Sequence, residues 1–417
     1  MYLMSDYLSV FNMVTEVVLL FLPLVLLAVI TSLFWERWVL YVRTNFINKQ
    51  ETILLQIIPP KEVEKSPKAA ELFLTSLHQT GGESNWYDRY WLGKTRAWFS
   101  LEMVSTEGKV AFYIWTRKSF AKNIETQIYG QYPTAEIKEV SDYIHGIDYK
   151  SGDYAMWGSQ YALTAKDAYP IQTYVDFGLD KESEESMKVD PMTATIEFLG
   201  SLNQGEHVWI QILVRAHKKE DPDHSKFVLY KPKTWFAKQD NWQEDAKKEI
   251  QDIKEKVSPK NEEGKPDISK AQLTEGDKTK IAALERSVSK YGFDVGIRSI
   301  YLAPKDDFNP GNIGGIVGAF KQYGSLNLNG FRPDSTTSVD YPWQDITGKK
   351  VKKKKEKMFD AYINRGYFHP PYKQKNVFIL NTEELATIYH LPGLSVATPS
   401  FKRTSSTKAE PPANLPI

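Results

Sequence analysis

The sequence predicts an α+β protein in which an N-terminal transmembrane helix precedes two tandem ferredoxin-like (βαββαβ) modules. An uncharged apolar run near the N-terminus predicts the helix, and a strand and helix order that occurs twice predicts the modules. The length of 417 residues suits two to three folded units. The predicted parts are a short extracytoplasmic segment 1–11, a transmembrane helix 12–34, a juxtamembrane segment 35–50, a first module 51–145, a linker 146–168, a second module 169–331 and a Lys- and Pro-rich C-terminal region 332–417.

Composition excludes several classes of protein. Hydrophobic residues make up 41% and charged residues 25% of the chain, which is typical of a globular protein. The net charge of +1 gives no overall attraction to nucleic acid, so any such attraction must come from a local patch. The absence of cysteine excludes disulfides, thiolate metal sites and a cysteine nucleophile.

The apolar run covers residues 17–34 without a charge, and about 27 Å of helix nearly matches a hydrocarbon core of about 30 Å. Trp35, Trp38 and Tyr41 follow it as an interfacial aromatic belt. The alternative is a cleaved signal peptide, but no Lys or Arg precedes the run and no small residues follow it. We therefore expect a retained anchor.

Basic residues predict how this anchor is oriented. Arg37, Arg43 and Lys49 follow the apolar run, and no Lys or Arg precedes it. Cytoplasmic flanks of membrane helices carry the excess of Lys and Arg. We expect a single-pass protein with its N-terminus outside and most of the chain in the cytoplasm.

The first module is predicted element by element. Residues 53–58 form a strand that Pro59-Pro60 ends, and Ser66-Pro67 begins a helix. The alternating stretches 98–104 and 110–115 predict a hairpin around Glu107-Gly108. The order is completed by a helix over 119–129 and a strand over 135–140.

The second module repeats this order. The phrase FL-x-SL-x-Q occurs at 73–79 and again at 198–204, inside a helix that begins at Asp190-Pro191. An internal repeat tests the whole element order at once. The remaining elements are predicted as strands 171–177, 207–216, 294–303 and 325–331 and a helix over 310–323.

The second copy carries an insertion in its hairpin, at 218–291. Two helical stretches, 242–257 and 277–291, are rich in Lys and Glu. They are interpreted either as a solvated helical arm or as a docking arm for a partner subunit. Because a short turn can join the two flanking strands, we expect the insertion to be dispensable for folding.

No catalytic motif is complete. Gly93-Lys94-Thr95 imitates the end of a phosphate-binding loop, but Asp88 stands where the loop needs a glycine. The stretch 217–224 contains two histidines and acidic residues whose spacing fits no helix face. We predict no catalytic, cofactor or metal site, with an unseen carboxylate site as the weakest alternative.

Two surfaces are candidates for binding. Strand alternation places Trp98, Tyr113 and Trp115 on the sheet face away from the helices. Stacking on nucleic-acid bases is one interpretation, and packing against the second module is the preferred one. The other surface is the lysine run. It is interpreted either as a solvated loop or as a contact surface for anionic lipid or DNA phosphate. Its central residues are Lys352, Lys353, Lys354 and Lys355.

The C-terminal region is predicted to end in a short helix and a tail. The helix covers 382–391 and should pack on one of the modules. The tail contains Pro411 and Pro412 and suits a spacer or a peptide ligand.

Several phrases together resemble a known family. ETILLQIIPP, AAELFLTSLHQT, SLEMVSTEGKVAFYIWT and IETQIYGQYPTAEIKEVSDY resemble the N-terminal, non-motor region of bacterial type IV secretion or conjugation ATPases of the coupling-protein kind. NVFILNTEELATIYHLPG and KAEPPANLPI resemble the segment that leads into their motor domain, whose phosphate-binding motif does not occur in this sequence.

The resemblance implies a non-enzymatic adaptor in the bacterial cytoplasmic (inner) membrane. Its expected partners are the lipid bilayer and a separate translocation ATPase or another secretion-machine subunit, and homo-oligomers stay open. The alternative function is a nucleic-acid-binding module that uses the aromatic sheet face and the lysine run.

Overall fold

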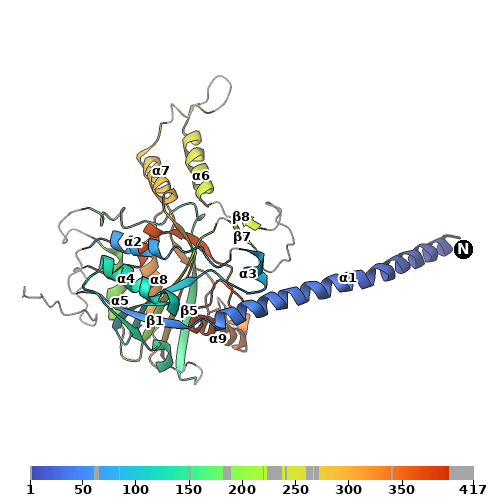
Figure 1. Ribbon diagram of the computed structural model, residues 1–417, viewed down its shortest axis with the longest axis horizontal. Coiled ribbons are helices and arrows are strands. Elements are labelled where there is room, and N and C mark those ends of the chain that lie inside the picture. Colours follow the sequence, from blue (N-terminus) through green and yellow to red (C-terminus); the bar gives the residue numbers. More distant parts are fainter. Residues whose placement is uncertain are drawn as a thin grey trace, which may run out of the picture. The chain divides into compact units, whose positions relative to one another are not determined.

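Figure 1 shows the chain as a computed structural model. It describes residues 2–60, 65–83, 85–147, 149, 152–181, 189–218, 220–222, 237–239, 242–259, 266, 272–339 and 341–393. These residues divide into two compact units. The first unit comprises the described parts of 1–50, 81–95 and 218–240, and the second unit comprises the rest.

The first unit is built on one long helix, α1 (Tyr2–Asn48). Within it, Thr15–Asn48 contains a stretch long and apolar enough to cross a membrane. Pro23 lies inside the helix without ending it. The apolar side chains along this stretch are exposed, with Leu20 at 70%. The helix predicted from the apolar run is therefore present, and it continues beyond the predicted end at residue 34.

A short helix that the sequence did not predict, α3 (Trp86–Tyr90), also belongs to the first unit. The Asn85 side chain accepts a hydrogen bond from the Asp88 backbone at 2.8 Å and so caps its N-terminus. The indole N–H of Trp38 donates to the carbonyl of Tyr90 at 2.9 Å, which joins α3 to α1. The strands β7 (Glu220–Pro222) and β8 (Ala237–Gln239) pair with each other in the same unit.

The second unit contains an antiparallel sheet of nine described strands in the order β10-β5-β9-β6-β2-β3-β1-β4, with β11 paired to β9. The strands are β1 (Thr52–Ile58), β2 (Trp98–Thr106), β3 (Lys109–Arg117), β4 (Glu136–Val140), β5 (Tyr154–Leu163), β6 (His207–Ala216), β9 (Gly292–Pro304), β10 (Phe331–Pro333) and β11 (Phe378–Asn381). The α+β class and the antiparallel sheet are as predicted.

The two halves of this sheet have the same strand order. The half β4-β1-β3-β2 meets the half β10-β5-β9-β6 where β2 pairs with β6, from Trp98 opposite Arg215 to Thr106 opposite His207. Both strands would otherwise be sheet edges with unpaired backbone groups. The halves therefore form one continuous sheet.

The predicted strand over 171–177 and linker over 146–168 are wrong. The first strand of the second half is β5, which lies inside the predicted linker, and 171–177 contains no strand and forms turns from Tyr174 on. The backbone N–H groups of Ile171 and Tyr174 donate to the side chains of Glu384 and Thr387. Because these side chains satisfy the backbone, the apolar residues of the segment are buried without a strand partner. Of the predicted strand over 325–331, only Phe331 lies in a strand, β10, which continues to Pro333.

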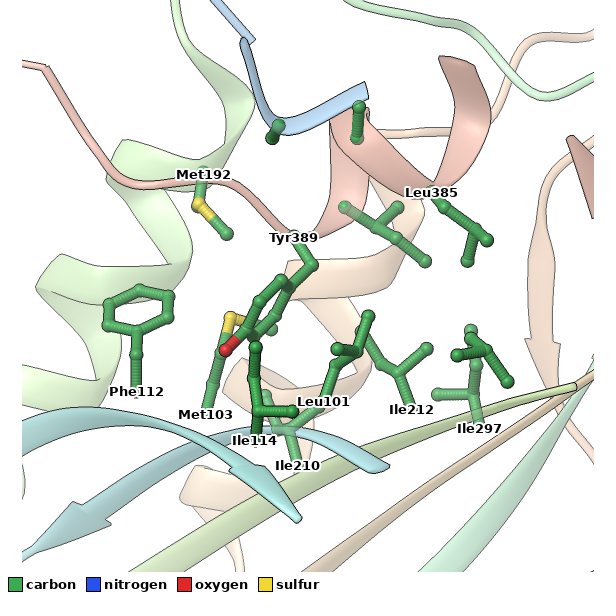
Figure 2. Packing of buried hydrophobic residues seen from close by; sticks show 14 of the residues in the cluster. Leu101, Met103, Phe112, Ile114, Met192, Ile210, Ile212, Ile297, Leu385 and Tyr389 are labelled. Carbon is green, nitrogen blue, oxygen red and sulfur yellow. The ribbon is translucent and has the colours of Figure 1, made fainter. Parts of the chain in front are cut away.

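Helices cover one face of the sheet and build the main core with it. They are α2 (Lys68–Ser76), α4 (Ala121–Gln131), α5 (Pro191–Gly200), α8 (Gly311–Lys321) and α10 (Thr382–Ile388). Figure 2 shows Leu101, Ile210 and Ile297 from the strands facing Met192 of α5 and Leu385 of α10. The predicted Asp190-Pro191 start of α5 is confirmed, because the Asp190 side chain accepts from the Met192 backbone at 2.8 Å.

The opposite face of the sheet is covered by a segment from the C-terminal region. Helix α9 (Lys349–Ile363) places Met358, Phe359 and Tyr362 against the sheet residues Trp209 and Ile300. Three short 3₁₀ turns lie among the described residues outside the main helices: η1 (Lys118–Phe120), η2 (Tyr143–Gly146) and η6 (Pro342–Asp345). The Lys- and Pro-rich region is thus an integral layer of the second unit up to Gly393.

The predicted insertion contains α6 (Trp242–Lys256) and α7 (Glu275–Val288), close to the two helices expected. Ala246 and Ile250 of α6 pack on Ile281 and Leu284 of α7. At the base of the pair, Arg286 contacts Glu383 at 2.8 Å, and this glutamate side chain is only 3% exposed. The base of the arm therefore neutralises a buried charge of α10, which argues against removing the whole insertion.

We expect the tip of the helical arm to be dispensable for folding and its base to be required for full stability. The backbone N–H of Gln272 donates to the carbonyl of Val257 at 3.4 Å, so these two positions lie close enough for a short turn. Replacing 259–271 with Asn-Gly should leave the midpoint of urea unfolding unchanged. Arg286→Ala should lower it, because it leaves Glu383 without this partner. Equal midpoints for both variants would contradict the assignment.

Candidate functional site

The three predicted aromatic residues lie on the sheet face that α9 and the chain after it cover. Trp98 is only 6% exposed, and its indole N–H donates to the carbonyl of Arg365 at 3.0 Å. Trp115 is 5.8 Å from Trp98 between ring centroids, and Tyr113 stacks on Tyr143 at 5.1 Å. Trp98 is therefore covered by the segment after α9 and Tyr113 by Tyr143, and not by the second module that the sequence analysis expected. The second half cannot stack face to face because β2 and β6 join it edge to edge.

Beneath this cover, a row of polar side chains crosses the middle of the sheet. Glu102, Gln211 and Arg298 occupy paired positions on β2, β6 and β9, and Tyr113 stands opposite Glu102 on β3. Gln211 donates to Glu102 at 2.8 Å and accepts from Arg298 at 2.6 Å. These three residues are fully buried, so each hydrogen bond replaces one to water.

Arg365 closes the row from above. Its guanidinium contacts both carboxylate oxygens of Glu102, at 3.0 and 3.2 Å, and also binds Asp142. Burial disfavours its charged form, but Glu102 and Asp142 nevertheless raise the pKa of Arg365 well above its usual value. Its side chain is 2% exposed, so the ion pair with Glu102 is a buried one.

Tyrosine and serine hydroxyls complete the environment of Glu102. Tyr143 donates to it at 2.8 Å and Ser100 at 2.7 Å. Burial and the charge of Glu102 raise the pKa of Tyr143 well above 10, so its hydroxyl stays protonated. Four side chains, Ser100, Tyr143, Gln211 and Arg365, donate hydrogen bonds to Glu102, and we assign the row a structural role in holding the C-terminal segment on the sheet.

The predicted lysine run forms helix α9 and not a loop. Its apolar face packs on the sheet, and Lys352, Lys353 and Lys354 are exposed on the other side. Lys355 is half-buried, and burial lowers its pKa. Lys352 is 3.9 Å from Glu356, an exposed pair of little energetic value. The helix thus presents a row of solvated positive charge.

Exposed aromatic and apolar residues lie directly before this helix. The rings of Tyr341 and Trp343 stack at 4.5 Å and 9°, with exposures of 52% and 69%. Ile346 is 88% exposed. Lys350 donates to the carbonyl of Gln344 at 3.0 Å, which links the two parts. We call Tyr341, Trp343, Ile346 and the lysines of 349–354 the α9 surface; the sequence analysis missed its aromatic members.

A second buried ionic cluster surrounds Asp294 on β9. Arg215 binds one of its carboxylate oxygens at 2.7 Å, Arg96 lies 3.5 Å from the same oxygen, and His217 contacts the other at 2.6 Å. Burial acts to raise the pKa of Asp294, but these partners outweigh it and lower that pKa to about 2. This cluster ties β6, β9 and the residues before β2 together.

The other motifs fall as follows. Lys94, which follows α3, pairs with Asp88 of α3 at 2.8 Å. Among the described residues no group of three or more His, Asp or Glu is placed to hold a metal ion. His224 of the stretch 217–224 and the tail residues Pro411 and Pro412 lie outside the described residues.

Comparison with known proteins adds one finding. No curated protein matches the sequence. A family described as a domain of unknown function (DUF8128) matches residues 43–404, a range that begins in the last turns of α1 and includes every strand among the described residues. The chain therefore belongs to the DUF8128 family.

Proposed function

We propose that the protein is a single-pass, membrane-anchored, non-enzymatic adaptor of a type IV secretion or conjugation-like translocation machine. Each half of the sheet would be a ferredoxin-like module, the second with the helical insertion. The observation that carries the proposal is α1, whose apolar side chains are exposed along a stretch long enough to span a bilayer. The bacterial cytoplasmic membrane and the machine come from the resemblance of the sequence phrases alone.

The orientation of the anchor is open to a direct test. With the N-terminus outside, protease added to intact cells should leave the sheet undigested, and protease added to inverted membrane vesicles should remove it. A soluble cytoplasmic protein that stays undigested serves as the control for cell integrity. Digestion of the sheet in intact cells would overturn the orientation.

The tail is the proposed docking site for a separate ATPase. We expect that removal of 404–417 leaves the unfolding midpoint unchanged and abolishes co-purification with an ATPase encoded nearby. A polar, Pro-rich segment contributes little to a core but can bind as an extended peptide. A variant with Pro411 and Pro412 changed to Ala tests the peptide itself. Recovery of the ATPase at full yield by the truncated chain would contradict docking.

Nucleic-acid binding is the second candidate function, and the α9 surface is the proposed binding surface. Trp98 is buried and cannot stack on a base, whereas Tyr341 and Trp343 are exposed beside the lysines. If DNA binds here, exchanging Lys352, Lys353 and Lys354 for Gln should weaken oligonucleotide binding. It should also lower the slope of the logarithm of the binding constant against the logarithm of salt concentration, by an amount that corresponds to up to three ion contacts. Exchange of Lys278, Lys280 and Lys247 on the helical arm is the matched control. Equal loss in both variants would indicate nonspecific attraction only.

A further inference from the structure

We propose that α3 and the residues after it, up to Leu92, form a second membrane-contact element that lies in the headgroup layer beside α1. The inference rests on the proposed function, because it takes α1 as the anchor. All residues involved belong to the first unit. The occupant of the surface is the bilayer into which α1 inserts.

The first step is the depth at which α3 is held. The uncharged run ends at Phe34, and Trp38 lies about 6 Å further along the helix axis. The headgroup layer on each side of a bilayer is about 5–7 Å thick. A residue at the position of Trp38 therefore lies within that layer when the apolar run spans the hydrocarbon.

The second step is that α3 is fixed at this level. The Trp38 indole N–H donates to Tyr90, and the Trp38 ring meets the Trp91 ring at 5.3 Å. Trp35 contacts Tyr90 at 5.2 Å between ring centroids. Gly93 has φ +63°, and a side chain there would come within 2.3 Å of the Val42 carbonyl. The backbone at the end of the segment therefore lies directly against α1.

The third step is what α3 exposes. Trp86, Tyr87 and Trp91 are 47%, 55% and 46% exposed, and Leu92 is 39% exposed. So many large apolar side chains in seven residues are unusual on a surface that faces water. Trp and Tyr are enriched where hydrocarbon meets headgroups, because their rings are amphipathic.

The charged residues of the segment do not oppose this placement. Asp88 is 9% exposed and pairs with Lys94, so its charge is balanced within the segment. Arg89 donates to the carbonyl of Glu83 at 3.0 and 3.1 Å. Long basic side chains near a membrane helix end extend toward phosphate groups. The exposed side chains are thus aromatic and aliphatic, and the charge of Asp88 is balanced by Lys94.

The test uses the absence of cysteine from the chain. The full chain is reconstituted in phosphatidylethanolamine and phosphatidylglycerol vesicles, with one nitroxide label at a time on Leu20→Cys, Tyr87→Cys, Trp86→Cys or Tyr291→Cys. Collision rates with oxygen and with a water-soluble nickel complex report the depth of each label. Tyr291 is 57% exposed in the second unit and serves as the aqueous control.

We expect Leu20→Cys to report hydrocarbon, Tyr87→Cys and Trp86→Cys an intermediate depth, and Tyr291→Cys water. Nickel accessibility at Tyr87 and Trp86 equal to that at Tyr291, with Leu20 still in hydrocarbon, would overturn this inference and leave the anchor standing. Water accessibility at Leu20 would overturn the anchor itself. The two α3 positions guard against misfolding of one variant, because both must agree.

Discussion

Replacing Arg365 with methionine is expected to lower the free energy of unfolding by about 3–5 kcal/mol, one of the largest effects of any single substitution in this protein. The substitution leaves Glu102 as a fully buried carboxylate without the cation that binds it directly. It also removes the side-chain contact to Asp142. Urea unfolding of the full chain in detergent, followed by tryptophan fluorescence, measures the change.

Two controls separate the buried charge from lost packing. The double variant Glu102→Gln with Arg365→Met removes both charges and should recover a large part of the loss. Arg332→Met breaks an exposed pair with Asp334 at 3.7 Å and should change stability by less than about 1 kcal/mol. If the double variant is no more stable than Arg365→Met, the buried charge is not the cause.

Acidification is the second large effect, and Asp294 is its expected source. Its pKa is lowered from 3.8 to about 2, so the folded state binds a proton less readily than the unfolded state. The resulting stabilisation is fully present above about pH 4 and is lost as the pH falls toward 2. The shift corresponds to about 2 kcal/mol, measured as the fall in unfolding free energy between these pH values.

The variant Asp294→Asn tests this source. It leaves Arg215 and Arg96 buried beside a neutral amide, so it should be less stable than the parent by about 3–5 kcal/mol at neutral pH. Its unfolding free energy should also depend less on pH between 4 and 2. Asp306→Asn, in the exposed turn after β9, is the matched control and should follow the parent curve. An unchanged acid dependence in Asp294→Asn would exclude this residue as the source.

Local pattern predicted most of the elements, because each depends on residues close in sequence. Strand β6 has the predicted bounds, the hairpin turns at Glu107-Gly108, and Glu107 has the positive φ that such a turn requires. The failure at 171–177 has a different cause. Its alternating apolar residues are buried, but the partner that satisfies the backbone is α10, more than 200 residues further along the chain.

The sites were less predictable than the fold. Glu102 interrupts an apolar strand, which signals a partner without identifying it, and Arg365 has no local feature that connects it to Glu102. The aromatic face was correctly placed on the sheet, yet its cover depends on how the two halves join. The pairing of β2 with β6 depends on tertiary packing, and the spacing of apolar residues in the sequence does not predict it. The position of α3 beside α1 also depends on tertiary contacts that the sequence pattern does not predict.

The joining of the halves has a consequence for synthesis on the ribosome. Gln211, the partner of Glu102 on β6, follows it by 109 residues, and Arg365 follows it by 263. Translation proceeds at about 5–20 residues per second. Gln211 of β6 is therefore synthesised about 5–20 s after Glu102 of β2, and Arg365 about 13–50 s after Glu102. During that interval the nascent first half exposes an unpaired strand and an uncompensated carboxylate. Completion of the sheet is therefore deferred until nearly the whole chain has been translated.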